Sequence, residues 1–193
     1  MRYPARLVIP YFAAIALGST MAYAASDDPG TGSGQTEWIN PVVKDYGKMH
    51  PVPDGALTPD PKKDWKIVFD VGGGKTMEDG VNAALWHVAR AVNVYGNAGV
   101  DKEHRKFAVV LHGAATKLAL SPEAYKKKFG NDDPDTKLKK ELAEAGVTLY
   151  VCGQALADHG FSEDQVGPNV DVALSALAAV PVLESQGYQL FPM

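Results

Sequence analysis

Cys152, the only cysteine in the chain, is the residue whose type and position most clearly point to chemistry. The apolar and β-branched run at residues 147–151 that precedes it is typical of a buried strand, and Gly153 and Gln154 follow where a helix can begin. This order predicts a sulfur atom just past the carboxyl end of a strand, where open α/β sheets bind ligands. Unpaired N–H groups at a helix start also lower a thiol pKa. The alternative is that Cys152 is a small buried apolar side chain.

Two further side chains are predicted at the same edge of the sheet. His112, which Gly113 follows, ends the apolar run 107–111, and Asp70 lies near the end of the run 66–71. Carboxyl ends of parallel strands share one edge, so we expect both side chains near the thiol. A histidine there could stabilise a thiolate or hold an oxyanion, whereas a nearby carboxylate would raise the thiol pKa. Alternatively, a backbone carbonyl satisfies His112.

Other catalytic patterns are incomplete in this chain. The segment 72–76 resembles a phosphate loop, but Phe69 stands where that pattern requires a glycine, so we interpret the glycines as a tight turn. The G-x-S-x-G elbow of serine hydrolases and the second cysteine of thioredoxin-type exchange are missing. His50, His87, His104 and His159 show no metal-ligand spacing, so we expect neither a metal site nor a cofactor. Chemistry at the thiol must therefore produce a persulfide or a mixed disulfide.

The elements that would position these residues alternate along the chain. Apolar and β-branched runs predict strands at residues 66–71, 107–111, 147–151, 170–172 and 188–191. Apolar spacing, caps and breakers predict helices at residues 77–95, 122–129, 136–145, 153–159 and 173–184, and Pro181 should kink or divide the last one. This alternation predicts an α/β three-layer sandwich with a mainly parallel sheet of four or five strands and helices on both faces.

The amino-terminal part differs in character from the rest. Residues 1–24 have the three parts of a secretory signal peptide: two arginines, a short apolar stretch, and a small-residue cleavage site that ends at Ala24. We predict that residues 25–37 are a flexible leader, residues 38–64 an extended proline-rich arm, and residues 65–193 the α/β domain. The alternatives are an uncleaved membrane anchor at the start and a disordered linker in place of the arm.

Charge and compartment narrow the range of partners. The net charge is −4 and no face is evidently basic, so we expect no nucleic-acid partner. Cleavage of the signal peptide would leave a periplasmic or secreted protein with no membrane attachment. A single cysteine cannot form an internal disulfide, and an idle exposed thiol is a liability in an oxidising compartment. The predicted periplasmic or secreted location therefore favours a functional role for Cys152.

Several of these segments together resemble the DsrE/DsrF-like family. The resemblance rests on residues 109–113, residues 146–156 with the strand–Cys–Gly–Gln element, and the closing Gly187-Tyr188. The arm, with Asn40-Pro41 and Tyr46-Gly47, is similar to the extension of the exported branch, and the likeness extends over about residues 38–191. It implies a small α/β sandwich of flavodoxin-like outline that assembles as trimers or hexamers. It also implies a sulfur-relay role, in which Cys152 carries a persulfide.

Our leading hypothesis is therefore an exported sulfur-handling protein in which the Cys152 thiolate accepts sulfane sulfur and passes it on. His112 would tune the site, and Gly153, Gln154, Gly113 and Asp70 would contact the substrate. One alternative is a non-catalytic module that binds a small ligand or serves assembly, with Cys152 in its core. Another is a redox sensor that forms an intersubunit disulfide. The residues do not identify the sulfur donor or the acceptor.

Overall fold

Five parallel strands form the centre of the domain. The computed structural model describes residues 37–193, so the predicted signal peptide and nearly all of the predicted leader lie outside the described residues. The strands are β1 (Trp65–Val71), β2 (Arg105–Leu111), β3 (Thr148–Cys152), β4 (Val170–Ala173) and β5 (Gln189–Pro192). They form one sheet in the order β4-β3-β2-β1-β5, and each neighbouring pair is parallel. The predicted parallel sheet is confirmed, with β2 at its centre.

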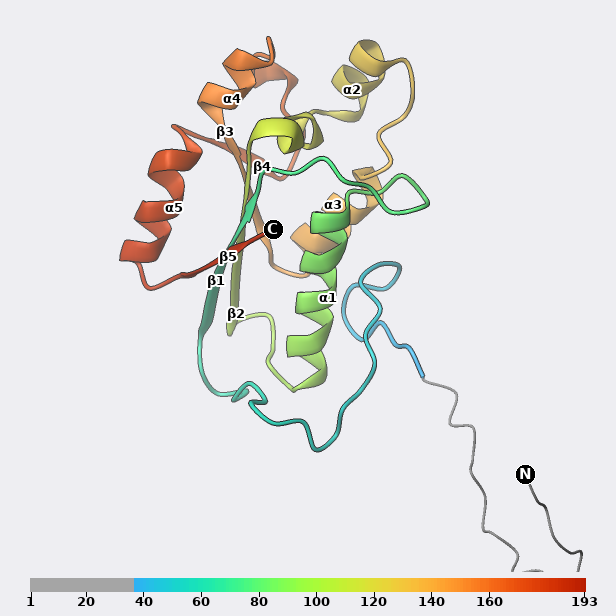
Figure 1. Ribbon diagram of the computed structural model, residues 1–193, viewed down its shortest axis with the longest axis vertical. Helices are drawn as coiled ribbons and strands as arrows, with labels where there is room; N and C mark the ends of the chain where they lie inside the picture. The colour runs from blue at the N-terminus through green and yellow to red at the C-terminus, as the bar shows by residue number, and fades with distance from the viewer. Residues whose placement is uncertain (1–36) are drawn as a thin grey trace, which may run out of the picture. The chain divides into compact units, whose positions relative to one another are not determined.

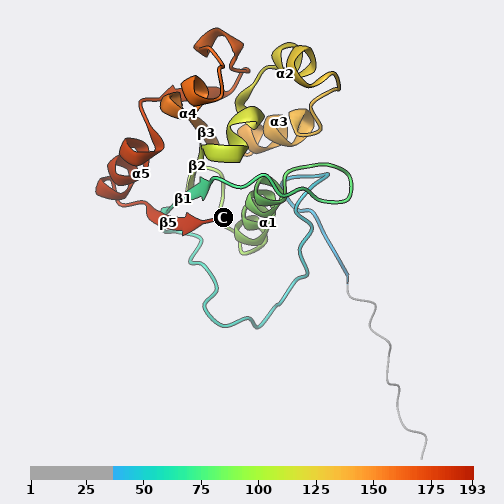
Figure 2. The ribbon, with the colours of Figure 1, turned by 45° about the horizontal axis from the view of Figure 1, so that its top comes forward.

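Helices cover both faces of this sheet (Figure 1). They are α1 (Ala83–Asn97), α2 (Pro122–Phe129), α3 (Thr136–Glu144), α4 (Gly153–Asp158) and α5 (Ala176–Ser185), with short 3-10 helices η1 (Gly113–Ala119) and η2 (Glu163–Gln165). Figures 1 and 2 show α1 and α3 on one side of the sheet and α5 on the other. This arrangement confirms the predicted three-layer α/β sandwich. No helix within residues 37–193 combines the length and apolar character needed to cross a bilayer.

Alternate strand residues point to two separate apolar layers. The larger layer packs the sheet against α1 and α3, and its strand residues include Phe69, Val109 and Val151. The smaller layer holds Val68 and Val110 and packs against α5. A parallel sheet that is covered on both faces buries both sets of side chains, which is why its strands read as nearly continuous apolar runs.

The first helix starts later than its apolar spacing predicted. Met77 and Val81 continue the helical stripe, but α1 begins at Ala83. Asn82 is the N-cap: its side-chain oxygen accepts the backbone N–H groups of Ala84 and Leu85. The residues before it form a turn that Thr76 and Asn82 close with an isolated antiparallel bridge. The prediction was wrong here because apolar spacing cannot show where the cap lies.

The last helix is shorter than predicted and is continuous. β4 and the loop after it take up its first three predicted residues, and α5 begins at Ala176 after the N-cap Ser175. Pro181 lies inside α5 but does not divide it. The proline has no N–H to donate to the carbonyl of Leu177. Leu177 is almost fully exposed, so water can satisfy that group.

The segment of residues 38–50 packs against α1. Asn93 of α1 is fully buried, and its side-chain oxygen accepts the N–H groups of Val42 and Val43 at 2.9 and 2.8 Å. Its amide nitrogen donates to the carbonyl of Tyr46 at 3.0 Å. One buried polar side chain thus holds several backbone groups of this segment, and the side chain of Val43 becomes part of the larger core.

Candidate functional site

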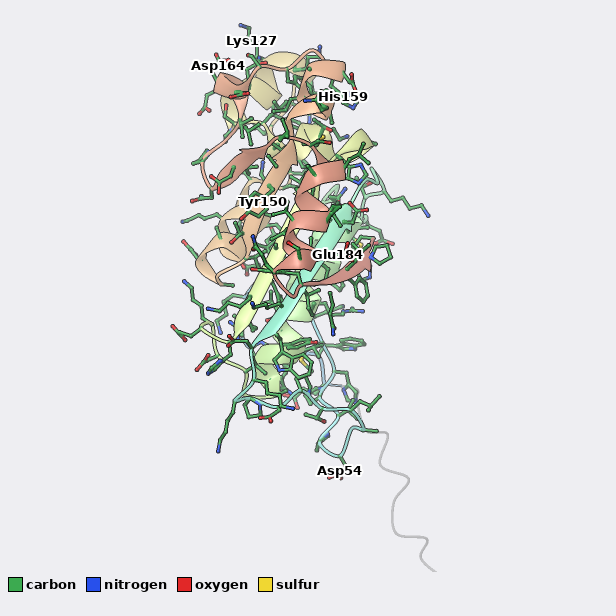
Figure 3. The ribbon with its side chains drawn as sticks, turned by 90° about the vertical axis from the view of Figure 1, so that its left-hand side faces the viewer. Asp54, Lys127, Tyr150, His159, Asp164 and Glu184 are labelled. Atoms are coloured by element: carbon green, nitrogen blue, oxygen red, sulfur yellow. The ribbon has the colours of Figure 1, made fainter. Side chains whose placement is uncertain are left out.

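A pocket of about 540 Å³ lies at the carboxyl edge of the sheet, on the face that α5 covers. Its walls come from the ends of β1, β2 and β3 and from α4 and α5. Figure 3 views the molecule from this side, with Tyr150 of β3 beside α5 and His159 at the end of α4. Five of the six predicted site residues line the pocket: Asp70, His112, Gly113, Cys152 and Gln154. Gly153 does not line it.

Cys152 is both the last residue of β3 and the N-cap of α4. Its side chain is only 5% exposed but forms part of the pocket wall. The N–H of Ala155 donates to the sulfur at an N···Sγ distance of 3.4 Å. The N–H groups of Ala176 and Gln154 and the hydroxyl of Ser175 also act on the sulfur and favour its ionised form. The sulfur therefore receives donors from the starts of both α4 and α5.

These donors make the thiol more acidic than an ordinary cysteine. Burial alone raises the pKa of Cys152, because a thiolate loses hydration inside the protein. The N–H groups of Ala176, Ala155 and Gln154 and the Ser175 hydroxyl favour the thiolate, and together they lower the pKa below its usual value. All four donors are neutral, so this stabilisation requires no cation.

Sequence reasoning missed the contribution of Ser175 and Ala176. β3 and β4 are neighbours in register, with Cys152 opposite Ala173, so the loop after β4 reaches the end of β3. Ser175 also caps α5, since its oxygen accepts the N–H of Leu177 at 3.1 Å. A serine before a helix is a recognisable cap signal. The predicted helix began too early for that signal to be used.

Gly153 and Gln154 hold the two loops together. A side chain on Gly153 would place its Cβ 3.0 Å from the carbonyl oxygen of Ala173, so a glycine lets α4 start close against the end of β4. The amide of Gln154 donates to the carbonyl of Leu174 at 3.2 Å. Gly153 therefore packs against the end of β4, whereas Gln154 both lines the pocket and contacts the neighbouring loop.

His112 is paired with Asp70 across the ends of β2 and β1. Nε2 of His112 lies 2.9 Å from Oδ1 of Asp70, and each side chain is about one third exposed. The partner of the ring is thus a carboxylate rather than the backbone carbonyl considered above. The ring packs on Gly72, where an added Cβ would lie 2.7 Å from Cε1. The glycine turn after β1 therefore makes room for the imidazole.

The pocket also contains Asp158 and His159, from the end of α4. Within the part of the chain that the structure describes, no three His, Cys, Asp or Glu side chains are grouped so that they could hold a metal ion. The chemical resources of the site are therefore an acidic thiol, an imidazole–carboxylate pair and a set of neutral N–H donors.

Comparisons with known proteins identify a matching family model and a similar solved structure. The model of the DsrE/DsrF-like family matches residues 66–192. A solved structure of a protein of unknown function from Methanobacterium thermoautotrophicum is similar, with 18% sequence identity and a TM-score of 0.47, over 67% of this chain and 100% of that one. A comparison with curated proteins found no significant match.

Proposed function

Because the chain belongs to the DsrE/DsrF-like family, which is associated with sulfur relay, we propose that it is an exported sulfur-handling protein. Cys152 accepts sulfane sulfur as a persulfide and passes it to an acceptor. The observation that carries this proposal is the sulfur atom itself: it forms part of a pocket wall and receives N–H donors from two helix starts. Such an environment favours the thiolate, which is the nucleophilic form. The exported location stays a prediction from residues 1–24.

Sulfur uptake requires no oxidant. The Cys152 thiolate attacks the outer sulfur of a donor, the donor's S–S bond breaks, and its electron pair leaves with the rest of the donor. Cys152 then carries one additional sulfur atom, and attack on that atom by an acceptor thiolate restores the starting thiolate. The N–H groups that favour the thiolate would also favour the terminal anion of a bound persulfide, provided that it stays within reach of them.

The dimensions of the pocket support a small or slender donor. A volume of about 540 Å³ is in the range of small-molecule sites, whereas only 5% of the Cys152 side chain is exposed. Inorganic polysulfide and low-molecular-weight persulfides carry their reactive sulfur at the end of a chain that can enter such an opening. A bulky reagent would react slowly at the same thiol.

The test is to incubate the protein with polysulfide and record its intact mass. We expect a mass gain of one sulfur atom that dithiothreitol removes, and no gain in Cys152→Ser. Labelling of wild-type protein with a persulfide-reactive alkylating agent, followed by peptide mapping, should place the atom on Cys152. If no donor adds sulfur to folded wild-type protein, the proposal is wrong.

The low exposure of Cys152 favours one alternative, a binding or assembly module in which the thiol is structural. The two hypotheses, a structural thiol and a functional thiolate, predict different reactivity of Cys152 in the native protein. A structural thiol should react with iodoacetamide only as fast as the protein unfolds, whereas a functional thiolate should react in the native state. The same burial opposes an intersubunit disulfide, because a second copy cannot easily bring its own sulfur to Sγ.

A further inference from the structure

Asp70 and His112 face the pocket that also holds Cys152, so three reactive groups share one small volume. The hydrogen bond between Oδ1 of Asp70 and Nε2 of His112, at 2.9 Å, fixes the orientation of the imidazole. Nδ1 of His112 has no hydrogen-bond partner among residues 37–193, and the ring is partly exposed. One ring nitrogen is therefore held by a carboxylate, and the other makes no hydrogen bond within the described residues on a ring that lines the pocket.

Transfer of sulfur from a persulfide creates a need for a proton in this pocket. The group that leaves an alkyl persulfide is an alkyl thiolate, whose conjugate acid has a pKa of about 8.5. A thiolate leaves faster as its basicity falls, so a proton delivered as the S–S bond breaks speeds the step. The Cys152 thiolate itself is held by neutral N–H and O–H donors, so the charge of His112 is not needed for that task.

We propose that His112 is the catalytic proton donor to the leaving sulfur when sulfur is transferred from a low-molecular-weight alkyl persulfide. Asp70 is the positioning residue for His112. This inference rests on the proposed function. The Cys152 thiolate attacks the outer sulfur of R–S–SH and forms a new S–S bond. The bond between the two donor sulfurs breaks, its electron pair goes to R–S, and the imidazolium proton moves from Nδ1 to that sulfur. The products are the Cys152 persulfide, R–SH and neutral His112. Charge and atoms balance without an oxidant or reductant.

The other titratable groups of the pocket form no comparable pair of a histidine and a carboxylate. Asp158 and His159 lie on the α4 side, and α5 contributes no titratable side chain to the pocket wall. The ring of His159 donates no hydrogen bond to a carboxylate in the described part of the chain, and that ring stacks on Phe161 instead. His112 is thus the histidine whose orientation a carboxylate fixes in this pocket.

Two donors with different leaving groups separate proton donation from other roles of His112. Glutathione persulfide releases a basic thiolate, whereas benzenethiosulfonate releases a weakly basic sulfinate that needs no proton. We expect His112→Gln to slow sulfur uptake from glutathione persulfide by about 100-fold or more and to change uptake from benzenethiosulfonate by only a few-fold. His87→Gln, on α1 outside this pocket, is the matched control and should leave both rates unchanged.

Asp70→Asn tests the positioning residue with the same two donors. The variant loses the carboxylate that fixes the orientation of the imidazole, so uptake from glutathione persulfide should slow several-fold while uptake from benzenethiosulfonate stays nearly unchanged. Asp158 and His159 are unchanged in this variant, so the difference between the donors reports on the pair rather than on the pocket as a whole. A purely structural Asp70 would slow uptake from both donors equally.

The outcomes distinguish this inference from the proposed function. If wild-type protein takes up sulfur but His112→Gln slows both donors equally, or neither, the proton-donor role is wrong while the persulfide role stands. If wild-type protein takes up no sulfur from either donor, the proposed function itself fails. Alkylation by iodoacetamide, in which iodide leaves without a proton, shows whether the variant keeps the same thiolate. His112→Asn replaces the first variant if that one does not fold.

Discussion

The sulfur of Cys152 combines low exposure with a lowered pKa, and these two properties usually oppose each other. A cysteine that is only buried has a raised pKa and is inert. Here the N–H groups of Ala176, Ala155 and Gln154 and the hydroxyl of Ser175 outweigh the cost of burial. The site therefore differs from a core cysteine in the donors around its sulfur rather than in its exposure.

This difference can be measured with iodoacetamide. In native protein, the pH at which the Cys152 alkylation rate reaches half its maximum should lie below that of the urea-denatured chain. Ser175→Ala removes one donor and should raise this midpoint. Because the folded pKa is the lower one, ionisation of Cys152 adds to stability above the unfolded pKa, and this contribution is lost as the pH falls through the folded pKa.

The control for this experiment is Ser121→Ala. Ser121 caps α2 as Ser175 caps α5, since its oxygen accepts the N–H of Ala124 at 3.1 Å. Each substitution should cost about 1 kcal/mol of stability through loss of the cap. Only Ser175→Ala should move the alkylation midpoint. An unchanged midpoint in Ser175→Ala would show that its hydroxyl does not act on the thiolate.

Single residues of the site could be predicted, but their pairing could not. Cys152, His112 and Asp70 lie at or next to the carboxyl ends of three strands, and the parallel sheet brings those ends to one edge. The hydrogen bond between Asp70 and His112 depends on side-chain orientation, which spacing in the sequence does not specify. Ser175 reaches the sulfur only because β4 lies beside β3, and strand order is not a local property.

At the scale of elements, the strands were predicted more accurately than the helix ends. A strand buried on both faces is marked by its own apolar residues, as in β2, whose one exposed residue is Lys106. The start of α1 instead depends on Asn82 and on the distant residue Asp135. The backbone N–H of Asn82 donates to Oδ1 of Asp135, next to the start of α3, at 2.8 Å. A cap that is held by another element cannot be read from the periodicity of its own helix.

The burial of the Asp135 carboxyl makes the stability of the domain depend on pH. Burial raises the pKa of Asp135 to about 6, although the N–H of Asn82 acts to lower it. A raised folded pKa means that its contribution is fully present below the unfolded pKa and is lost as the pH rises through 6. Asp135→Asn keeps an oxygen for Asn82 but carries no charge. We expect the variant to gain about 1 kcal/mol relative to wild type between pH 5 and pH 8, measured by urea unfolding.

Asp132→Asn is the control for this pH effect. Asp132 lies in the same loop but is exposed and pairs with Lys126 at the surface. Its substitution should change stability little, and equally at both pH values. A constant difference between Asp135→Asn and wild type across this pH range would show that Asp135 does not titrate with a raised pKa.

At the scale of the whole molecule, an apolar groove of about 830 Å³ lies between α1 and the edge strand β5. β5 pairs only with β1 in the described structure, and Leu190 and Phe191 on it are 43% and 54% exposed. An apolar edge strand with free backbone groups is a surface for association. This groove is consistent with the homo-oligomer that the family resemblance implies, which stays a prediction.

Sedimentation equilibrium tests whether this edge is used. We expect wild-type protein to have the mass of a trimer or hexamer, and Phe191→Ser to have a lower average mass at the same concentration. Leu57→Ser removes another exposed apolar side chain that does not line the groove, so it should not change the mass. A wild-type monomer, or a variant that assembles as wild type does, would contradict this role for β5.

The donors around the sulfur come from two segments that are separated in the sequence by β4. α4 follows Cys152 directly, but Ser175 and Ala176 lie beyond β4 and join the site only when that edge strand is in place beside β3. Displacement of the loop between β4 and α5 would therefore make the thiol less acidic while leaving the cysteine and its own helix intact. The alkylation rate of Cys152 thus measures whether the loop between β4 and α5 is in place beside the sulfur. A molecule that binds to α5 and moves this loop would change the reactivity of the sulfur without touching it.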